Sequence, residues 1–351
     1  MGSPDKFKKR VGVTGGAGFI GSNLLLHLVP EYPEYLFINL DCLTYAGNLS
    51  NLAAIENSPN YVFEKVDIRQ SHQLRQCFMK YAVDSVIHLA AESHVDRSIH
   101  GPADFIQTNI IGTFNLLELA REKIPHFRFL HVSTDEVFGS LEDNSCSTES
   151  TPYNPNSPYS ASKAAADHLV RAYHQTYGLD TVTANSSNNF GPYQFPEKII
   201  PLTIINARNK SFIPIYGDGE NVRDWLYVKD HCRALDLAFH YGRPGQTYNI
   251  GASNQLRNID VVERICGIMD SILGDGPYRK LIKFVKDRPG HDRRYAVDAS
   301  RLETQLHWKP QFAFDDALRS TVEWYLDNWP WVENCTTGDY RKYYSQNYEN
   351  R

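Results

Sequence analysis

Three glycines, each separated from the next by two residues, follow the first apolar run of the chain. Gly15, Gly18 and Gly21 come directly after residues 11–14, and a helical pattern begins at Phe19. Glycines let the backbone turn tightly and approach a pyrophosphate, and the N-terminus of the following helix supplies N–H donors and a partial positive charge. The glycines alone could form a simple tight turn. Their position between a strand and a helix predicts a dinucleotide-binding unit.

Short apolar runs alternate with helical patterns throughout the first half of the chain. The runs do not alternate with polar residues, which is typical of strands buried on both faces of a parallel sheet. We therefore expect an α/β fold with a Rossmann-type, doubly wound parallel sheet. The expected strands are 10–14, 35–41, 61–67, 85–90, 127–134 and 181–187, and the expected helices include 19–28, 103–121 and 157–177.

The second expected strand ends in an acidic residue that bears on the choice of cofactor. Asp41 follows Gly21 at the spacing where a carboxylate accepts hydrogen bonds from the adenosine ribose and repels a 2′-phosphate, which favours NAD over NADP. The alternative role for this residue is a turn or helix cap. Asp67 and Ile68 end the third strand and are expected to contact adenine, and residues 88–91 are expected to run under the cofactor.

The composition of the sequence changes after about residue 188, where Pro, Gly, Asn and aromatic residues become more frequent. We expect an NAD-binding Rossmann domain over residues 1–187 and a smaller mixed α/β substrate lobe over 188–351. Segments near 225–250 could return to the first domain.

Composition limits the partners of the chain. The 36 Lys and Arg against 41 Asp and Glu give a net charge of −5, which offers no reason to expect nucleic-acid binding. The six cysteines form no Cys-x-x-Cys pair, so we expect free thiols and no metal site. The first ten residues contain no apolar run, and no stretch approaches the roughly 18 apolar residues of a membrane span. These features predict a soluble, cytoplasmic protein.

Two pairs of residues carry candidate chemistry. Tyr159 and Lys163 lie four apart on an expected helix, so they share one face, where the ammonium would favour a tyrosinate. Asp135 and Glu136 follow the fifth strand, at the sheet edge where open α/β sheets bind ligands. One carboxyl can donate a proton while the other accepts one. Each pair alone could be an ordinary surface feature, but their presence with the glycine pattern in one chain favours catalysis.

With these residues in view, the chain resembles the extended short-chain dehydrogenase/reductases, and among them the dTDP-glucose 4,6-dehydratase branch of nucleotide-sugar enzymes. The resemblance covers nearly the whole chain, and the Thr-Asp-Glu motif is specific to this branch. Cys42 departs from the pattern, because many relatives carry Lys there. The matching stretches are 14–22, 43–48, 90–98, 133–139, 187–193, 195–198, 221–228, 287–295 and 338–340.

The resemblance, together with the glycine fingerprint, implies a set of site residues. The implied catalytic residues are Thr134, Asp135, Glu136, Tyr159 and Lys163. The implied cofactor contacts are Gly15, Gly18, Phe19, Ile20, Gly21, Asp41, Thr44, Asp67, Ile68, Leu89, Ala91, Ser93, Thr108, Tyr159, Lys163 and Asn189. The implied substrate contacts are Ser93, Thr134, Asn188, Lys198, Ile199, Pro214, Tyr216, Arg223, Asn258, Arg288 and His291.

The resemblance also implies an activity in deoxysugar biosynthesis. A nucleoside-diphosphate-glucose would be oxidised at C4 with NAD, lose water across C5 and C6, and regain hydride at C6. The thymidine nucleotide is the first expectation and UDP-glucose the second, since one methyl group separates them. The sequence also leaves open a UDP-sugar 4-epimerase, a UDP-glucuronate decarboxylase and a non-catalytic nucleotide-sensing module. The family pairs helices 103–121 and 157–177 of two copies into a four-helix bundle, so we expect a homodimer.

Overall fold

The computed structural model describes residues 7–142, 145–338, 340, 344 and 347. Residues 1–6, at the start of the N-terminal stretch without an apolar run, and Asp339, within the matching tail stretch, lie outside the described residues. Within the described residues, no helix has the length and apolar character needed to cross a membrane.

A seven-stranded sheet forms the centre of the molecule, with strand order β10-β6-β5-β4-β1-β2-β3 and every neighbouring pair parallel. The strand order reverses between β1 and β4, and open α/β sheets bind their ligands at such a switch point. The expected Rossmann-type sheet is confirmed, with strand ends shifted by at most two residues. The strands are β1 Lys9–Thr14, β2 Tyr35–Asp41, β3 Tyr61–Lys65, β4 Ser85–His88, β5 Arg128–Thr134, β6 Asp180–Ser186 and β10 Thr247–Ile250.

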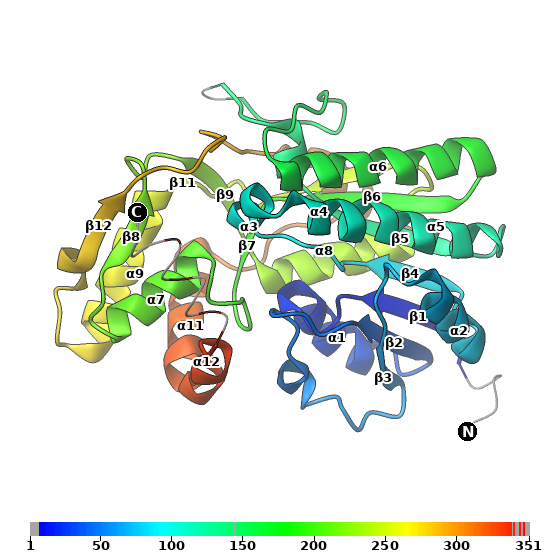
Figure 1. The fold of residues 1–351 in the computed structure, drawn as a ribbon, viewed down its shortest axis with the longest axis horizontal. Helices are drawn as coiled ribbons and strands as arrows, with labels where there is room; N and C mark the ends of the chain where they lie inside the picture. The colour runs from blue at the N-terminus through cyan, green and yellow to red at the C-terminus, as the bar shows by residue number, and fades with distance from the viewer. Residues whose placement is uncertain (1–6, 143–144, 339, 341–343, 345–346, 348–351) are drawn as a thin grey trace.

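Helices cover both faces of this sheet (Figure 1). Neighbouring strand residues are buried on opposite faces, so that Val86 and Phe129 join one core cluster while Ile87 and Leu130 join the other. This two-sided burial explains why the apolar runs do not alternate with polar residues. One face carries α1 (Phe19–Glu31) and α8 (Val228–Tyr241), and the other carries α2 (Ser71–Tyr81), α5 (Thr113–Arg121) and α6 (Pro158–Tyr177).

The helix expected over 103–121 is not a regular α-helix. A short α4 (Pro102–Phe105) leads into a π-helical segment, Ile106–Gly112, before α5 begins. A Cβ atom at Gly112 would lie 2.5 Å from the Ile68 side chain, so the helix passes very close to the loop after β3. Wide helical turns of this kind are frequent at functional sites. Here the π-helical segment carries Thr108 to the sheet edge.

A second, smaller group of elements lies beside one end of the sheet (Figure 1). Its strands form a three-stranded sheet, β11-β9-β7, and a parallel pair, β12-β8. The chain returns from this group to the main sheet through α8 and β10. The boundary at residue 187 stays a prediction. The elements are β7 Asn188–Phe190, α7 Ile199–Arg208, β8 Ile213–Tyr216, β9 Val222–Tyr227, β11 Gln255–Arg257, α9 Asn258–Leu273, β12 Ile282–Val285, α11 Phe314–Asp327 and α12 Trp329–Cys335.

Candidate active site

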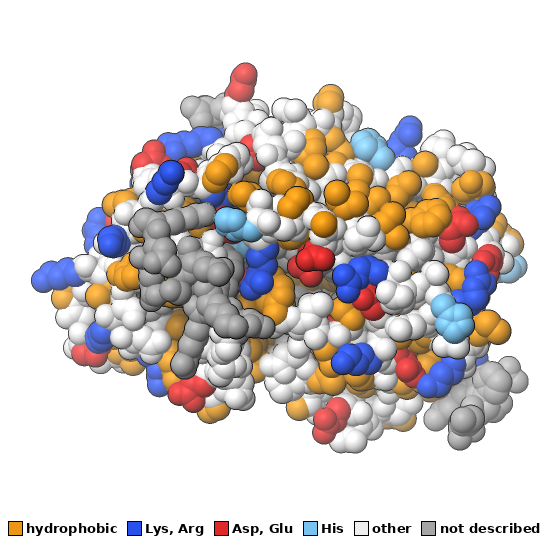
Figure 2. All heavy atoms as spheres, in the orientation of Figure 1, with side chains coloured by type: hydrophobic (Ala, Val, Ile, Leu, Met, Phe, Trp, Pro, Cys, Tyr) orange, Lys and Arg blue, Asp and Glu red, His pale blue; other side chains and the backbone are white. Residues whose placement is uncertain are grey.

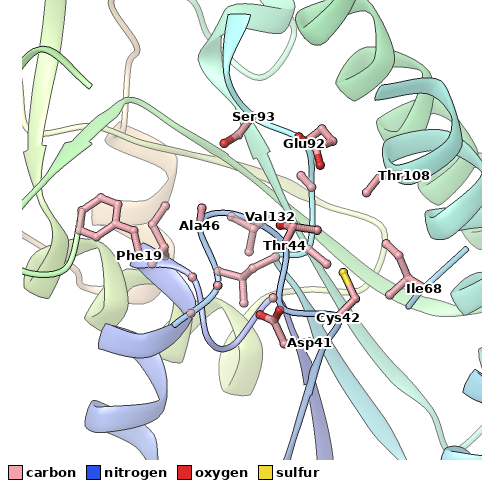
Figure 3. A pocket seen from close by; sticks show the side chains of 18 of the residues that line it. Phe19, Asp41, Cys42, Thr44, Ala46, Ile68, Glu92, Ser93, Thr108 and Val132 are labelled. Carbon is pink, nitrogen blue, oxygen red and sulfur yellow. The ribbon is translucent and has the colours of Figure 1, made fainter. Parts of the chain in front are cut away.

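A cavity of about 440 Å³ opens at the carboxyl ends of the central strands (Figure 3). In Figure 3, Phe19 lies on one side of it and Ile68 and Thr108 on the other, with Val132 between them. We call it the first pocket. It is lined by every expected cofactor residue except Asn189, namely Gly15, Gly18, Phe19, Ile20, Gly21, Asp41, Thr44, Asp67, Ile68, Leu89, Ala91, Ser93, Thr108, Tyr159 and Lys163.

The glycine turn shapes one wall of the first pocket. A Cβ atom at Gly21 would lie 2.2 Å from the Gly15 carbonyl oxygen, so the helix can begin this close to the turn only with glycine at this position. Gly15 has φ of +70°, and its Cβ atom would lie 2.8 Å from the Ala90 backbone. Helix α1 begins after Gly18 without a side-chain cap, so its first N–H groups are available to a bound anion. This geometry fits the pyrophosphate of a dinucleotide.

Asp41 lies at the end of β2 below the loop that carries Thr44 (Figure 3). Its carboxylate accepts hydrogen bonds from the Ala17 N–H at 2.9 Å and the Leu43 N–H at 2.8 Å, so it does cap a turn. Each oxygen has lone-pair capacity left for a ribose hydroxyl. Burial raises the pKa of Asp41, and the two N–H groups oppose that shift. These contacts fit NAD.

A side-chain bridge that no sequence pattern predicts includes Glu197, which lines the first pocket. The Tyr45 hydroxyl donates to Glu197 at 2.9 Å, and Arg97 Nε donates to the other carboxylate oxygen at 3.2 Å. The Arg97 guanidinium also lies 3.8 Å from the centre of the Tyr45 ring. The bridge joins the loop after β2 to residues 194–198, of which Gln194, Glu197 and Lys198 line both this pocket and the next.

Helix α6 presents Tyr159 and Lys163 to the first pocket. Ser157 caps the helix in a reciprocal capping box with Ser160, which fixes its first turn beside the sheet edge. The Lys163 ammonium donates to the Val132 carbonyl at 2.8 Å. Burial lowers the pKa of Lys163 to about 8.

The pKa of Tyr159 is raised, whereas we expected Lys163 to lower it. Burial is the main cause and the charge of Glu136 adds to it, while a hydrogen bond with Thr134 opposes the shift. Tyr159 therefore needs the positive charge of Lys163 and of a bound nicotinamide to act as a base at neutral pH.

The two adjacent carboxyl groups after β5 lie in different environments. Thr134 accepts a hydrogen bond from the Glu136 N–H at 3.2 Å and so caps the 3-10 turn that holds both acids. Asp135 is 3% exposed, and one of its oxygens has no partner among the described residues. Burial first, then the charges of Glu136 and Asp224, raise its pKa well above the usual value. Glu136 is less buried and lines a second cavity.

This second pocket, of about 150 Å³, lies between the main sheet and the smaller group of elements. Asn189 lines it, although we expected a cofactor contact there, whereas Ser93 lines only the first pocket and Thr134 lines neither. The remaining expected substrate residues all line it, namely Asn188, Lys198, Ile199, Pro214, Tyr216, Arg223, Asn258, Arg288 and His291.

Two guanidinium groups, Arg223 and Arg288, together with Lys198 bring positive charge to the second pocket. Arg223 is 4% exposed, donates to the Asp292 carbonyl at 2.9 Å, and lies over the Tyr295 ring. Burial and the charges of Arg288 and Arg223 lower the pKa of His291, so this ring is neutral beside them at neutral pH. Guanidinium forks match the oxygens of a diphosphate.

Several buried polar atoms in the second pocket have no hydrogen-bond partner among the described residues. Such atoms are rare in folded proteins unless a ligand or water satisfies them. Their concentration here fits a polar ligand such as a nucleotide sugar. They are Asp96 Oδ1, Asn188 Oδ1, Asn189 Oδ1, Gln194 Oε1, Trp225 Nε1, Asn258 Oδ1 and Arg288 Nε.

The parallel sheet, the glycine turn and the Tyr159–Lys163 pair define an extended short-chain dehydrogenase/reductase, in which a second, polar pocket lies beside the first. The chain belongs to the family described as GDP-mannose 4,6 dehydratase, whose model matches residues 13–321.

Individual relatives point to one branch. The dTDP-glucose 4,6-dehydratase of Shigella flexneri is 53% identical over 357 residues, covering 97% of this chain and 99% of that protein. Among solved structures, the dTDP-glucose 4,6-dehydratase of Streptomyces venezuelae with NAD bound is 45% identical, with a TM-score of 0.87 over 93% of this chain and 99% of that one. The NAD complex of Thermus thermophilus UDP-glucose 4-epimerase is 28% identical, with a TM-score of 0.82 over 91% and 99% of the two chains.

Proposed function

We propose that this chain is an NAD-dependent hydro-lyase that converts dTDP-glucose to dTDP-4-keto-6-deoxyglucose. The identity of 53% to a dTDP-glucose 4,6-dehydratase supports the substrate, and the NAD in a relative that is 45% identical supports the cofactor. The observation that carries the chemistry is the placement of Glu136 in the second pocket while Tyr159 and Lys163 line the first. A sugar between the two pockets reaches both sets of groups.

The residues divide the reaction into an oxidation and an elimination. The residues that line the first pocket would hold NAD, which would supply the hydride acceptor for oxidation at C4 and the hydride for C6. Tyr159, as a tyrosinate that the Lys163 ammonium stabilises, takes the proton of the 4-hydroxyl. The 4-ketone acidifies the hydrogen on C5, which Glu136 removes. Asp135 gives its proton to the departing 6-hydroxyl, and water leaves. Glu136 then returns its proton to C5 when C6 receives the hydride.

The buried state of Asp135 suits it for the second of these roles. A proton donor must hold its proton at the working pH, and an ordinary Asp is ionised at neutral pH. Because burial and neighbouring carboxylates raise its pKa, Asp135 stays protonated in conditions where an exposed Asp would not. Two adjacent carboxyl groups thus serve as acid and base.

Competing activities lack a use for this acid pair. A 4-epimerase needs only the tyrosine, the lysine and the cofactor, and a UDP-glucuronate decarboxylase needs no donor for a leaving hydroxyl. A non-catalytic sensing module would need neither pair. UDP-glucose is the second candidate substrate, since an apolar pocket discriminates one methyl group only modestly.

Mass spectrometry of reactions with dTDP-glucose and UDP-glucose tests the proposal. The product should be lighter by one water, without consumption of added NAD, and dTDP-glucose should react faster. Tyr159→Phe should form no product. An isomer of unchanged mass would point instead to an epimerase, and an equal or greater rate with UDP-glucose would overturn the choice of nucleotide.

We also propose a homodimer through a four-helix bundle. Ile106, Ile111, Phe114 and Tyr177 are 39% to 48% exposed along the π-helical segment, α5 and α6. Figure 2 shows hydrophobic side chains gathered over this face. Such a patch marks an interaction surface. Sedimentation should give a species of twice 40.1 kDa, and a 40.1 kDa species at micromolar concentration would contradict the dimer.

Localisation follows from the chemistry of the thiols. All six cysteines are free, which suits a reducing compartment, and we place the enzyme in the cytoplasm. The net charge of −5 gives no reason to expect nucleic-acid binding, so the nucleotide sugar and a second copy of the chain are the proposed partners.

A further inference from the structure

A buried carboxylate lies on α6, the helix that carries Tyr159 and Lys163, and has no role in the reaction described above. Asp167 is one turn after Lys163 on α6 and is 5% exposed. It accepts three hydrogen bonds, from His131 Nε2 at 3.0 Å, the Ser133 hydroxyl at 2.9 Å and the Tyr153 hydroxyl at 2.9 Å. A carboxylate with three donors is held in one orientation.

Asp167 and Lys163 bind the same short stretch of β5. The Lys163 ammonium donates to the carbonyl of Val132, and the residues on either side of Val132 donate to Asp167. That strand continues directly into the turn that carries Asp135 and Glu136. The carboxylate therefore joins the helix that carries one catalytic pair to the strand that carries the other.

We infer that Asp167 is a positioning residue whose carboxylate keeps the Lys163 ammonium charged and aligned beside Tyr159 during the oxidation step. The inference rests on the proposed function and adds to it a negative charge near the lysine, which acts through space and through the shared stretch of β5 and not through a direct ion pair among the described residues.

The electrostatics of the pair agree with this geometry. Burial lowers the pKa of Lys163 to about 8, and the Asp167 carboxylate opposes the shift. Burial raises the pKa of Asp167 to about 6, while Lys163, Ser133 and Tyr153 hold it down. Both groups are therefore ionised between these two values, which includes neutral pH.

The other titratable groups around the pair do not replace Asp167. His88 on β4 and His131 on β5 have pKa values well below the usual one because of burial, so both rings are neutral. His168, the next residue on α6, helps to lower the pKa of Asp167. The charge of Asp167 raises the pKa of Tyr159 and so opposes the ionisation of that side chain. The carboxylate therefore acts on Tyr159 favourably only through the lysine.

Asp167→Asn tests the inference in a single turnover of dTDP-glucose oxidation, followed by nicotinamide absorbance. Without the carboxylate the pKa of Lys163 should fall, so the alkaline limb of the pH–rate profile should move down by about one unit, and the rate at pH 8 should drop about fivefold. The loss should shrink at lower pH, and kcat should change more than KM. Tyr153→Phe removes one hydrogen bond and keeps the charge, so its alkaline limb should stay in place.

A second measurement needs neither cofactor nor substrate. Folded wild-type protein keeps a proton on Asp167 between the ordinary pKa of 3.8 and about 6, whereas the unfolded chain releases it. The free energy of unfolding should therefore decrease as pH rises through this window. Asp167→Asn should lack that contribution, so its stability relative to wild type should increase from pH 4 to pH 6 in urea titrations.

The outcomes separate the two proposals. Wild-type protein that fails to oxidise dTDP-glucose would overturn the proposed function. Wild-type protein that oxidises it, with an Asp167→Asn variant of unchanged pH profile, would overturn the inference alone. If Asp167→Asn does not fold, Asp167→Ser, which is smaller and also uncharged, should show the same shift of the alkaline limb, and an unshifted limb in that variant would equally overturn the inference.

Discussion

The two pockets are built in different ways. The first takes most of its lining from the ends of neighbouring parallel strands, and its anion site consists of backbone shaped by glycines. The second draws charged and amide side chains from segments between His94 and His291, several of them with unsatisfied polar atoms. A backbone site depends on local geometry and tolerates little added volume, whereas a side-chain site depends on individual charges. Substitutions in the two pockets should therefore fail in different ways.

The largest effect is expected at the acid pair, of which Glu136 lines the second pocket. Glu136→Gln and Asp135→Asn should each slow water loss by about 10²–10⁴-fold, because each removes a general acid or base. Both variants should still oxidise C4, so NADH should accumulate in a stopped-flow single turnover while mass spectrometry finds no dehydrated product. Water loss at the wild-type rate in Glu136→Gln would contradict the role of Glu136 as the base in the elimination.

Arg223 tests whether the second pocket depends on the individual side chains that line it. Arg223→Lys keeps the charge and loses the fork and the ring contact, so binding of dTDP-glucose should weaken by roughly 10- to 100-fold, the value of one charge-assisted hydrogen bond. Isothermal titration measures this. Arg293→Lys is the matched control, since Arg293 forms an exposed pair with Asp218. Equal losses in both variants would show that Arg223 has no special role.

Gly21 tests the backbone character of the first pocket. Gly21→Ala places a Cβ atom 2.2 Å from the Gly15 carbonyl oxygen, and overpacking of this kind destabilises by about 1–3 kcal/mol. NAD content after purification and the free energy of unfolding should both fall. Gly267→Ala on α9 has open space around the new methyl group and should be neutral or slightly stabilising. A fully loaded, stable Gly21→Ala protein would contradict the described turn.

The smallest effect is expected at Asp41. Asp41→Asn keeps the shape and removes the charge, so NAD should bind about tenfold more weakly and discrimination against NADP should relax. Competition between the two cofactors in a fluorescence titration measures the ratio. An unchanged ratio would mean that Asp41 serves only to cap its turn through Ala17 and Leu43.

The same contrast explains how much of the site could be predicted from the sequence. The glycine turn, the position of Asp41 after Gly21 and the pair Tyr159–Lys163 each depend on residues that lie close together in the chain. These local geometries could be predicted from spacing alone. Asp167 lies four residues after Lys163 on one helix face, so a signal for it was present in the sequence. The donors that give it a function, His131 and Ser133, come from a different element.

Further parts of the site depend on pairings that no local pattern encodes. The bridge between Tyr45 and Glu197 joins segments that lie far apart in the chain. Asn189 lies in the second pocket, away from the other expected cofactor contacts, and its position depends on how β7 pairs with β9. The π-helical form of Ile106–Gly112 depends on contact with the loop after β3. Each of these requires the packed fold before it can be inferred.

The position of β10 has a consequence for the way the protein is made. β10 pairs with β6 in the main sheet, and residues 187–246 separate the two strands along the chain. A ribosome therefore releases the first six strands of the sheet well before the seventh. During that interval the outer edge of β6 offers unpaired N–H and C=O groups, and such edges pair readily with other chains. A fragment ending at residue 187 should aggregate during synthesis, and the full chain should be most dependent on chaperones in this interval.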